Sequence, residues 1–172
     1  MEVPMAEQFL TLMAEYSGAD QERISVWYDA LQNAGFRGSQ TPGLKHHISL
    51  ATFPLDREAE AIQLTRQVAA QFGPVPVAIR HIGVMPGGKV LFAAPDTTPE
   101  LMALQRAASR GDVSAFPFLP HTTLLIDTPE TIAAARPTLV RHFTPLPATI
   151  DRLRLCAFWP TREIVEVKLE GE

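Results

Sequence analysis

Cysteine is almost absent from this chain of 172 residues. The single one, Cys156, cannot form a disulfide within the chain, which excludes a small disulfide-stabilised fold. No apolar run approaches the ~20 residues that a transmembrane helix needs. The first residues, Met-Glu-Val-Pro, also lack the basic start of a secretion signal. We therefore expect a cytoplasmic protein without a membrane partner.

Positive charge is also scarce. Lys and Arg number 15 against 19 Asp and Glu, which gives a formal net charge of −4. A long nucleic-acid track draws its affinity from many Lys and Arg contacts to phosphates, so we expect no extended DNA binding. A single nucleotide or one RNA end is compatible with this charge. The apolar content of 46% and the charged content of 20% are typical of a folded globular protein.

Two short segments, one in each half of the chain, share the pattern His-x-(Ser/Thr)-Leu. They are His47-Ile48-Ser49-Leu50 and His121-Thr122-Thr123-Leu124. Successive side chains of a strand point to opposite faces, so His47 shares a face with Ser49, and His121 shares a face with Thr123. The two segments together therefore predict two imidazoles and two hydroxyls around one small anion.

This set of side chains suits phosphoester chemistry. Displacement at phosphorus needs a base on the attacking oxygen and an acid on the leaving oxygen, and histidine can be either near neutral pH. We expect His47 and His121 to be catalytic. Ser49 and Thr123 are expected to donate hydrogen bonds to the phosphate oxygens, where charge builds in the transition state.

Strands and helices alternate around the two motifs. Apolar spacing predicts helices at 20–34, 56–72, 99–109 and 129–142; Asp20 is the expected cap of the first, and Pro137 lies inside the last. Alternation and turn residues predict strands at 46–53, 75–85, 89–94, 121–126, 148–158 and 163–169. Residues 8–15 fit either a strand or a helix.

The paired motifs resemble those of the two-histidine (2H) phosphoesterase superfamily, which includes 2′-5′ RNA ligases and 2′,3′-cyclic phosphodiesterases. The second motif, Phe118-Leu119-Pro120-His121-Thr122-Thr123-Leu124, matches closely. The first differs slightly, because His46 stands where proline is common and Ser49 replaces a threonine. The resemblance covers nearly the whole chain and implies that residues 8–15 form a strand.

The fold implied by this resemblance is α+β. Residues 1–172 would form a single domain of two pseudo-symmetric lobes, each an antiparallel sheet with outer helices. The two sheets would face each other across a central cleft that carries one His-x-Ser/Thr motif on each wall. The element order supports a degenerate duplication, because strand, helix, motif strand, helix and hairpin are followed by helix, motif strand, helix and hairpin.

The implied activity is metal-independent hydrolysis of a 2′,3′-cyclic phosphate, or a related phosphodiester, at a nucleotide or RNA end. Some members of the superfamily also catalyse the reverse 2′-5′ ligation. Two alternatives stay open: a nucleotide- or RNA-end-binding module with little turnover, and a metal-dependent hydrolase. His46, His47 and His121 could be metal ligands, but no cluster has metal-ligand spacing, so we expect no metal and no cofactor.

Candidate substrate contacts lie outside the motifs. Arg152 and Arg154 alternate with leucines, so they face either the cleft or solvent at an edge strand. Four aromatic residues could stack on an unpaired base or simply pack, namely Phe116, Phe118, Phe158 and Trp159. His46 should face away from His47 and pack or support the site.

Overall fold

The strand that organises the fold is β6 (Leu146–Phe158), which is 13 residues long in this computed structural model. The structure describes residues 8–110, 112 and 117–172. The other elements follow one another in the predicted order. They are β1 (Phe9–Tyr16), α1 (Gly18–Asn33), β2 (His47–Pro54), a 3-10 turn (Leu55–Arg57), α2 (Glu58–Gln71), β3 (Val75–Val84), β4 (Val90–Pro95), α3 (Pro99–Ala108), β5 (Thr122–Ile126), α4 (Pro129–His142) and β7 (Arg162–Lys168).

The described strands form one seven-stranded antiparallel sheet in the order β2-β1-β6-β3-β4-β5, with β7 also paired to β6. One side of β6 pairs with β1. Its other side pairs first with β3, over Leu146–Ile150, and then with β7, over 152–157. The expectation of two separate sheets is therefore wrong: the long strand β6 belongs to both halves and joins them.

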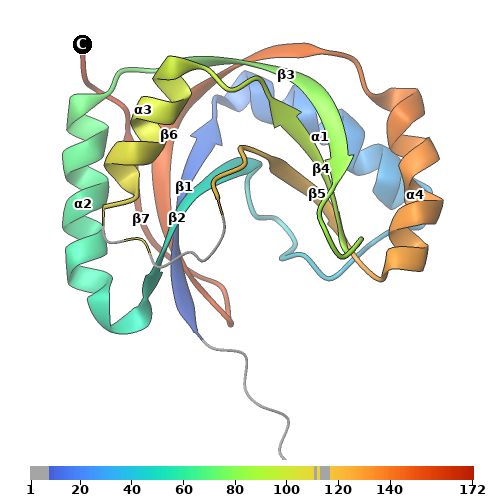
Figure 1. The fold of residues 1–172 in the computed structure, drawn as a ribbon, viewed down its shortest axis with the longest axis horizontal. Coiled ribbons are helices and arrows are strands. Elements are labelled where there is room, and N and C mark those ends of the chain that lie inside the picture. Colours follow the sequence, from blue (N-terminus) through green and yellow to red (C-terminus); the bar gives the residue numbers. More distant parts are fainter. Residues whose placement is uncertain (1–7, 111, 113–116) are drawn as a thin grey trace, which may run out of the picture.

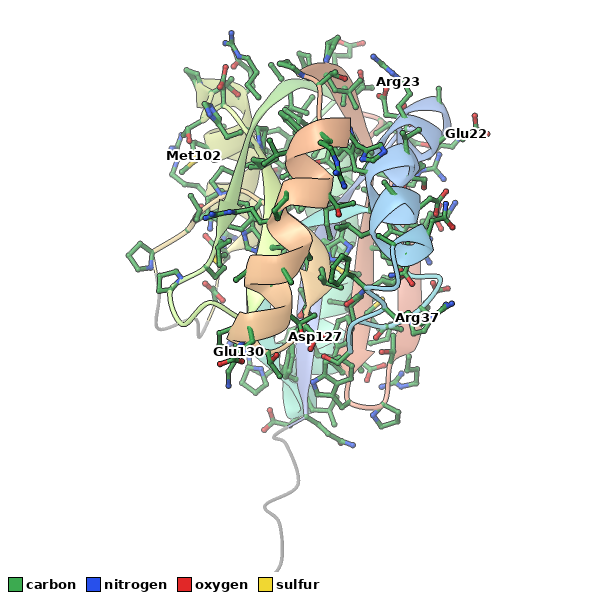
Figure 2. All side chains as sticks on the ribbon, turned by 90° about the vertical axis from the view of Figure 1, so that its right-hand side faces the viewer. Glu22, Arg23, Arg37, Met102, Asp127 and Glu130 are labelled. Atoms are coloured by element: carbon green, nitrogen blue, oxygen red, sulfur yellow. The ribbon has the colours of Figure 1, made fainter. Side chains whose placement is uncertain are left out.

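The sheet curls, so that its two edge strands, β2 and β5, approach each other although they lie at opposite ends of the strand order. The helices cover the outside in two pairs, α2 with α3 and α1 with α4 (Figure 1). Figure 2 shows α1 and α4 side by side, with charged side chains such as Glu22 and Glu130 on the outer surface. Within the described residues, no helix is both long and apolar enough to cross a bilayer.

Alternation along the two motif segments is as predicted. Ile48, Leu50 and Leu124 are almost completely buried in the core beneath the helices. His47 and Ser49, on the opposite face of β2, keep partial exposure, as do the corresponding residues of the second motif. The apolar positions therefore fix which face of each strand is turned to the inner side of the curled sheet.

The cap of the first helix differs from the prediction. The first helix begins at Gly18, because the Ser17 side chain accepts a hydrogen bond from the Asp20 N–H and is its N-cap. Asp20 lies in the first turn instead, where a carboxylate is favoured by the helix dipole. Pro137 neither ends nor splits α4, which runs continuously to His142.

Candidate functional site

A cavity of about 510 Å³ opens on the inner side of the curled sheet. His47 and Ser49 reach it from β2, and Thr123 reaches it from β5. These three residues come from strands that lie at opposite ends of the strand order, so the curl of the sheet brings them together. His121, two residues before Thr123, is partly buried, and its ring packs edge-on against Phe92 with centroids 5.4 Å apart.

The two motif histidines make the same hydrogen bond. His47 Nδ1 lies 2.7 Å from the carbonyl oxygen of Lys45, and His121 Nδ1 lies 2.8 Å from that of Leu119. In each case the acceptor is two residues before the histidine. A carbonyl can only accept, so Nδ1 carries the proton, and Nε2 is the nitrogen that can take or give one.

The electrostatics of the two rings are linked. Burial lowers the pKa of His47, and the positive charge of His121 lowers it further, against the Lys45 carbonyl, which raises it. Burial likewise lowers the pKa of His121, against the carbonyl of Leu119. Because a charge on one ring disfavours a charge on the other, a state with one neutral and one protonated ring is favoured over a doubly protonated state.

His46 contacts α1, and it lines the same cavity as His47. Its Nε2 lies 3.0 Å from the Ser25 hydroxyl, and its ring meets Tyr28 edge-on. Burial, followed by the charge of His47, lowers the pKa of His46 to about 4. This ring is therefore neutral at physiological pH, and it packs and forms a hydrogen bond at the wall of the cavity.

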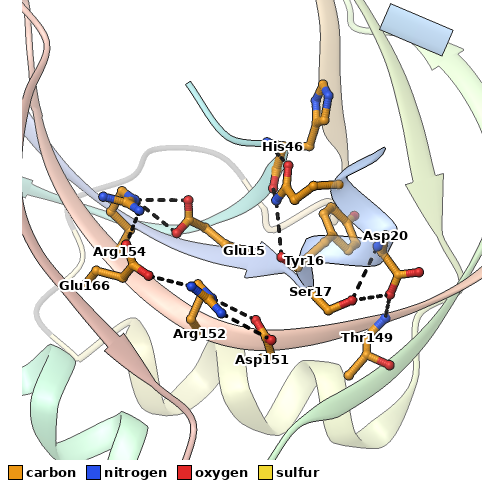
Figure 3. Close-up of polar contacts among 11 residues, drawn as sticks. Glu15, Tyr16, Ser17, Asp20, His46, Thr149, Asp151, Arg152, Arg154 and Glu166 are labelled. Atoms are coloured by element: carbon orange, nitrogen blue, oxygen red, sulfur yellow. Dashed lines mark hydrogen bonds and ion pairs between the residues drawn. The ribbon is translucent and has the colours of Figure 1, made fainter. Parts of the chain in front are cut away.

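Arg152 and Arg154 do not line the cavity. Arg154 is buried and donates from Nε to both carboxylate oxygens of Glu15 at 3.0 Å, while its other nitrogens pair with Glu163 and Glu166. Arg152 pairs with Asp151 and Glu166, as Figure 3 shows. These positions argue against the predicted substrate contacts, because carboxylates of β1, β6 and β7 already pair with the two guanidinium groups.

The aromatic residues divide between the cavity and the core. Phe158 and Trp159 line the cavity together with Phe9, and the rings are in contact, with centroids 5.6 Å apart for Phe9 and Phe158 and 5.5 Å apart for Phe158 and Trp159. Phe118 packs against the hydrophobic core instead and does not line the cavity. Phe116 lies outside the described residues.

Several polar residues of the site have no counterpart in the sequence prediction. Lys45 is the one Lys or Arg among the described residues that line the cavity, and Asp29 is the one carboxylate among them. Tyr16 and Gln21 form hydrogen bonds to Thr122 and His46, next to the two motif histidines. Neither belongs to a recognisable motif, so only the folded chain reveals them.

Across the described part of the chain, no group of three or more His, Cys, Asp or Glu side chains is arranged to hold a metal ion.

The architecture is that of an α+β protein whose fold is found in several solved structures. E. coli LigT in its apo form is 18% identical, with a TM-score of 0.66 over 96% of this chain and 100% of that chain. The Thermus thermophilus protein TT0787 is 17% identical, with a TM-score of 0.64 over 95% of this chain and 99% of that chain. Identities this low show a shared fold.

The family follows from the sequence itself. The model of the 2′-5′ RNA ligase superfamily matches residues 20–158, and the chain belongs to this superfamily, whose members are 2H phosphoesterases. The match confirms the resemblance carried by the two motifs. A comparison with curated proteins gave no match.

Proposed function

We propose that this protein is a metal-independent phosphodiesterase that hydrolyses 2′,3′-cyclic phosphates, or related phosphodiesters, at nucleotide or RNA ends. The observation that carries the proposal is the matched hydrogen bonding of His47 and His121. Each ring has Nδ1 bound to the carbonyl two residues earlier, which leaves Nε2 for proton transfer. Membership of the superfamily supports phosphodiester processing.

In the proposed reaction one histidine is neutral and the other is protonated. The neutral ring removes a proton from water as the water oxygen attacks phosphorus. The protonated ring gives its proton to the ribose oxygen as the bond from that oxygen to phosphorus breaks. The product of a 2′,3′-cyclic phosphate is then a phosphomonoester, as in superfamily members that form a 2′-phosphate. With a 5′-hydroxyl of RNA attacking phosphorus in place of water, and the ribose 3′-oxygen again leaving, the same two roles would form a 2′-5′ linkage, which is ligation.

The hydroxyls of Ser49 and Thr123 would donate hydrogen bonds to the non-bridging phosphate oxygens. Both residues line the cavity, and they come from β2 and β5, the two edge strands of the sheet, so they could reach a phosphate from two sides. Charge builds on these oxygens in the transition state, and preorganised donors stabilise it there.

A nucleotide is the substrate class that suits the rest of the cavity. A volume of about 510 Å³ lies within the range of sites for small organic ligands. The joined rings of Phe9, Phe158 and Trp159 offer a surface for a base, since stacking on aromatic rings is a common way to hold an unpaired base. The similar protein E. coli LigT has been solved in complexes with 3′-AMP and with phosphate.

The test is a panel of 2′,3′-cyclic mononucleotides, RNA ending in a cyclic phosphate, and 2′-5′-linked oligonucleotides, with each product identified by mass spectrometry. Turnover of a cyclic phosphate that survives dialysis against EDTA is expected. Activity lost on dialysis and restored by zinc or manganese would replace the proposal with a metal-dependent hydrolase. Binding of a 2′-phosphonucleotide without turnover of any substrate would replace it with a binding module.

A further inference from the structure

The end of β1 and the first turns of α1 contact the neighbour of each motif histidine. Tyr16, the last residue of β1, forms a hydrogen bond to Thr122, which lies between His121 and Thr123. Gln21, in the first turns of α1, binds the backbone of His46, which directly precedes His47. One short segment, residues 16–21, therefore contacts the second motif and the residue that directly precedes the first.

The Tyr16–Thr122 bond crosses between parts of the sheet that are not neighbours. The two hydroxyl oxygens are 2.7 Å apart and both side chains are buried. β1 and β5 are separated by β6, β3 and β4 in the strand order, so no backbone ladder joins them. Burial raises the pKa of Tyr16 far above its ordinary value, against the bond to Thr122, so the hydroxyl stays protonated and uncharged. The bond fixes the start of β5 relative to β1.

Gln21 replaces a missing strand partner. Glu15 of β1 pairs with His47, but the chain turns into α1 soon afterwards, so His46 has no ladder partner on β1. The amide of Gln21 takes that place: its Oε1 accepts from the His46 N–H at 2.8 Å, and its Nε2 donates to the His46 carbonyl at 2.7 Å. A side-chain amide thus reproduces both hydrogen bonds of a peptide group and holds the entry to β2.

The segment is itself anchored to β6. The Ser17 N–H donates to the Thr149 carbonyl at 2.8 Å, and the Thr149 N–H donates to the Asp20 carboxylate at 2.8 Å. The Ser17 hydroxyl donates to the same carboxylate at 2.8 Å (Figure 3). Both contacts to the motifs therefore start from a part of the chain that is fixed to the central strand.

We infer that Tyr16 and Gln21 are positioning residues for the two catalytic histidines: Tyr16 acts through Thr122 on His121, and Gln21 acts through His46 on His47. The inference rests on the proposed function for its kinetic consequences. Proton transfer needs both rings at hydrogen-bond distance from one phosphodiester, and a displacement of about 1 Å can cost on the order of 10²-fold in rate. A shared anchor sets the separation of the two rings before substrate binds.

The first experiment removes the hydroxyl bond. Tyr16→Phe and Thr122→Val are each expected to lower kcat by about tenfold to 10²-fold with KM little changed, and the double variant should lose no more than the stronger single one. Thr122→Ser keeps the hydroxyl and should retain wild-type turnover. Thr65→Val is the matched control, because Thr65 is fully buried in α2 and its hydroxyl donates to the Ala61 carbonyl of the same helix.

The second experiment removes the two hydrogen bonds between the Gln21 amide and the backbone of His46. Gln21→Met keeps the length of the side chain without its hydrogen bonds, and Gln21→Glu keeps the acceptor but loses the donor. Both variants should lower kcat by a larger factor than they change KM. The loss of a substrate contact in the cavity would instead chiefly raise KM. Gln32→Met is the matched control, because Gln32 lies on the same helix and donates to the Arg37 carbonyl on the surface.

A readout independent of turnover is the imidazole NMR spectrum of ¹⁵N-labelled protein. The Nδ1 proton of His121 should exchange faster with water in Tyr16→Phe, and that of His47 should do so in Gln21→Met, with both unchanged in the two controls. Unaltered exchange in both variants, or kcat values equal to those of the controls, would overturn the inference. A wild-type protein that turns over no phosphodiester would instead refute the proposed function, and the exchange rates would still decide the positioning roles.

Discussion

Replacement of His46 by Gln should flatten the dependence of stability on pH below neutrality. The pKa of His46 is lowered from 6.5 to about 4, chiefly by burial. The unfolded chain therefore takes up a proton on this ring near pH 6.5, whereas the folded chain resists it. The stability due to the neutral ring is complete above pH 6.5 and is lost as the pH falls from there toward 4.

The size of the effect follows from the shift. One pKa unit corresponds to about 1.4 kcal/mol, so a fall from 6.5 to about 4 makes the ring responsible for at most about 3.5 kcal/mol of acid destabilisation. The slope of the unfolding free energy should not exceed about 1.4 kcal/mol per pH unit for this one group. His46→Gln removes the titration, and its amide can still bind the Ser25 hydroxyl.

Urea unfolding of both proteins, followed by circular dichroism from about pH 7.5 to about pH 4.5, measures the difference. The lowered pKa values of His47 and His121 act on both proteins, so they cancel in the comparison. The stability gap between wild type and His46→Gln should therefore shrink or reverse as the pH falls. Two curves that stay parallel over this range would refute the reasoning, because the ring would then titrate alike in the folded and unfolded chains.

Three further predictions concern the site and the ion pairs of Arg154 with Glu15, Glu163 and Glu166. His47→Ala and His121→Ala should each lower kcat by about 10²–10⁴-fold with the fold intact; near wild-type turnover in either variant would contradict the assignment. Ser49→Ala and Thr123→Ala should lower kcat by on the order of 10²-fold, and less than the histidine variants in parallel assays; unchanged kinetics would show that the hydroxyls are ordinary strand residues. Arg154→Met leaves the buried carboxylate of Glu15 without its ion-pair partner and should lower the unfolding free energy, measured in urea, by about 3–5 kcal/mol. A loss below about 1 kcal/mol would mean that water reaches the carboxylate.

The sequence predicted those features that depend on local patterns. The helix 129–142 has the predicted bounds at both ends, and the hairpin of β3 and β4 lies within a residue of its predicted ends, since apolar spacing and turn residues act over short distances. The same local pattern predicted the faces of the motif strands, because alternation is a property of the strand itself.

Features that depend on pairing between distant segments could not be predicted from local sequence patterns. The local pattern predicts β6 and its hairpin partner β7 but not the pairing of β6 with β1 and β3, so the continuity of the sheet was missed. Arg154 looked available for substrate because its carboxylate partners, such as Glu15, are far away in the sequence. Tyr16 and Gln21 lie outside the motifs. The contact of Tyr16 exists because the curl of the sheet brings β5 close to β1, and that of Gln21 exists because α1 lies over the entry to β2.

The central position of β6 also determines when the sheet can form during synthesis. Phe9 near the start of the chain pairs with Phe158 near its end. Until the ribosome has released the residues of β6, β1 with β2 and β3 with β4 and β5 are two separate pieces, and each has an unpaired edge. Such edges are templates for aggregation, and long-range pairing slows folding. The edges of β1 and β3 that pair with β6 therefore stay unpaired until β6 has been made, and in that interval they are the part of the sheet most prone to aggregate.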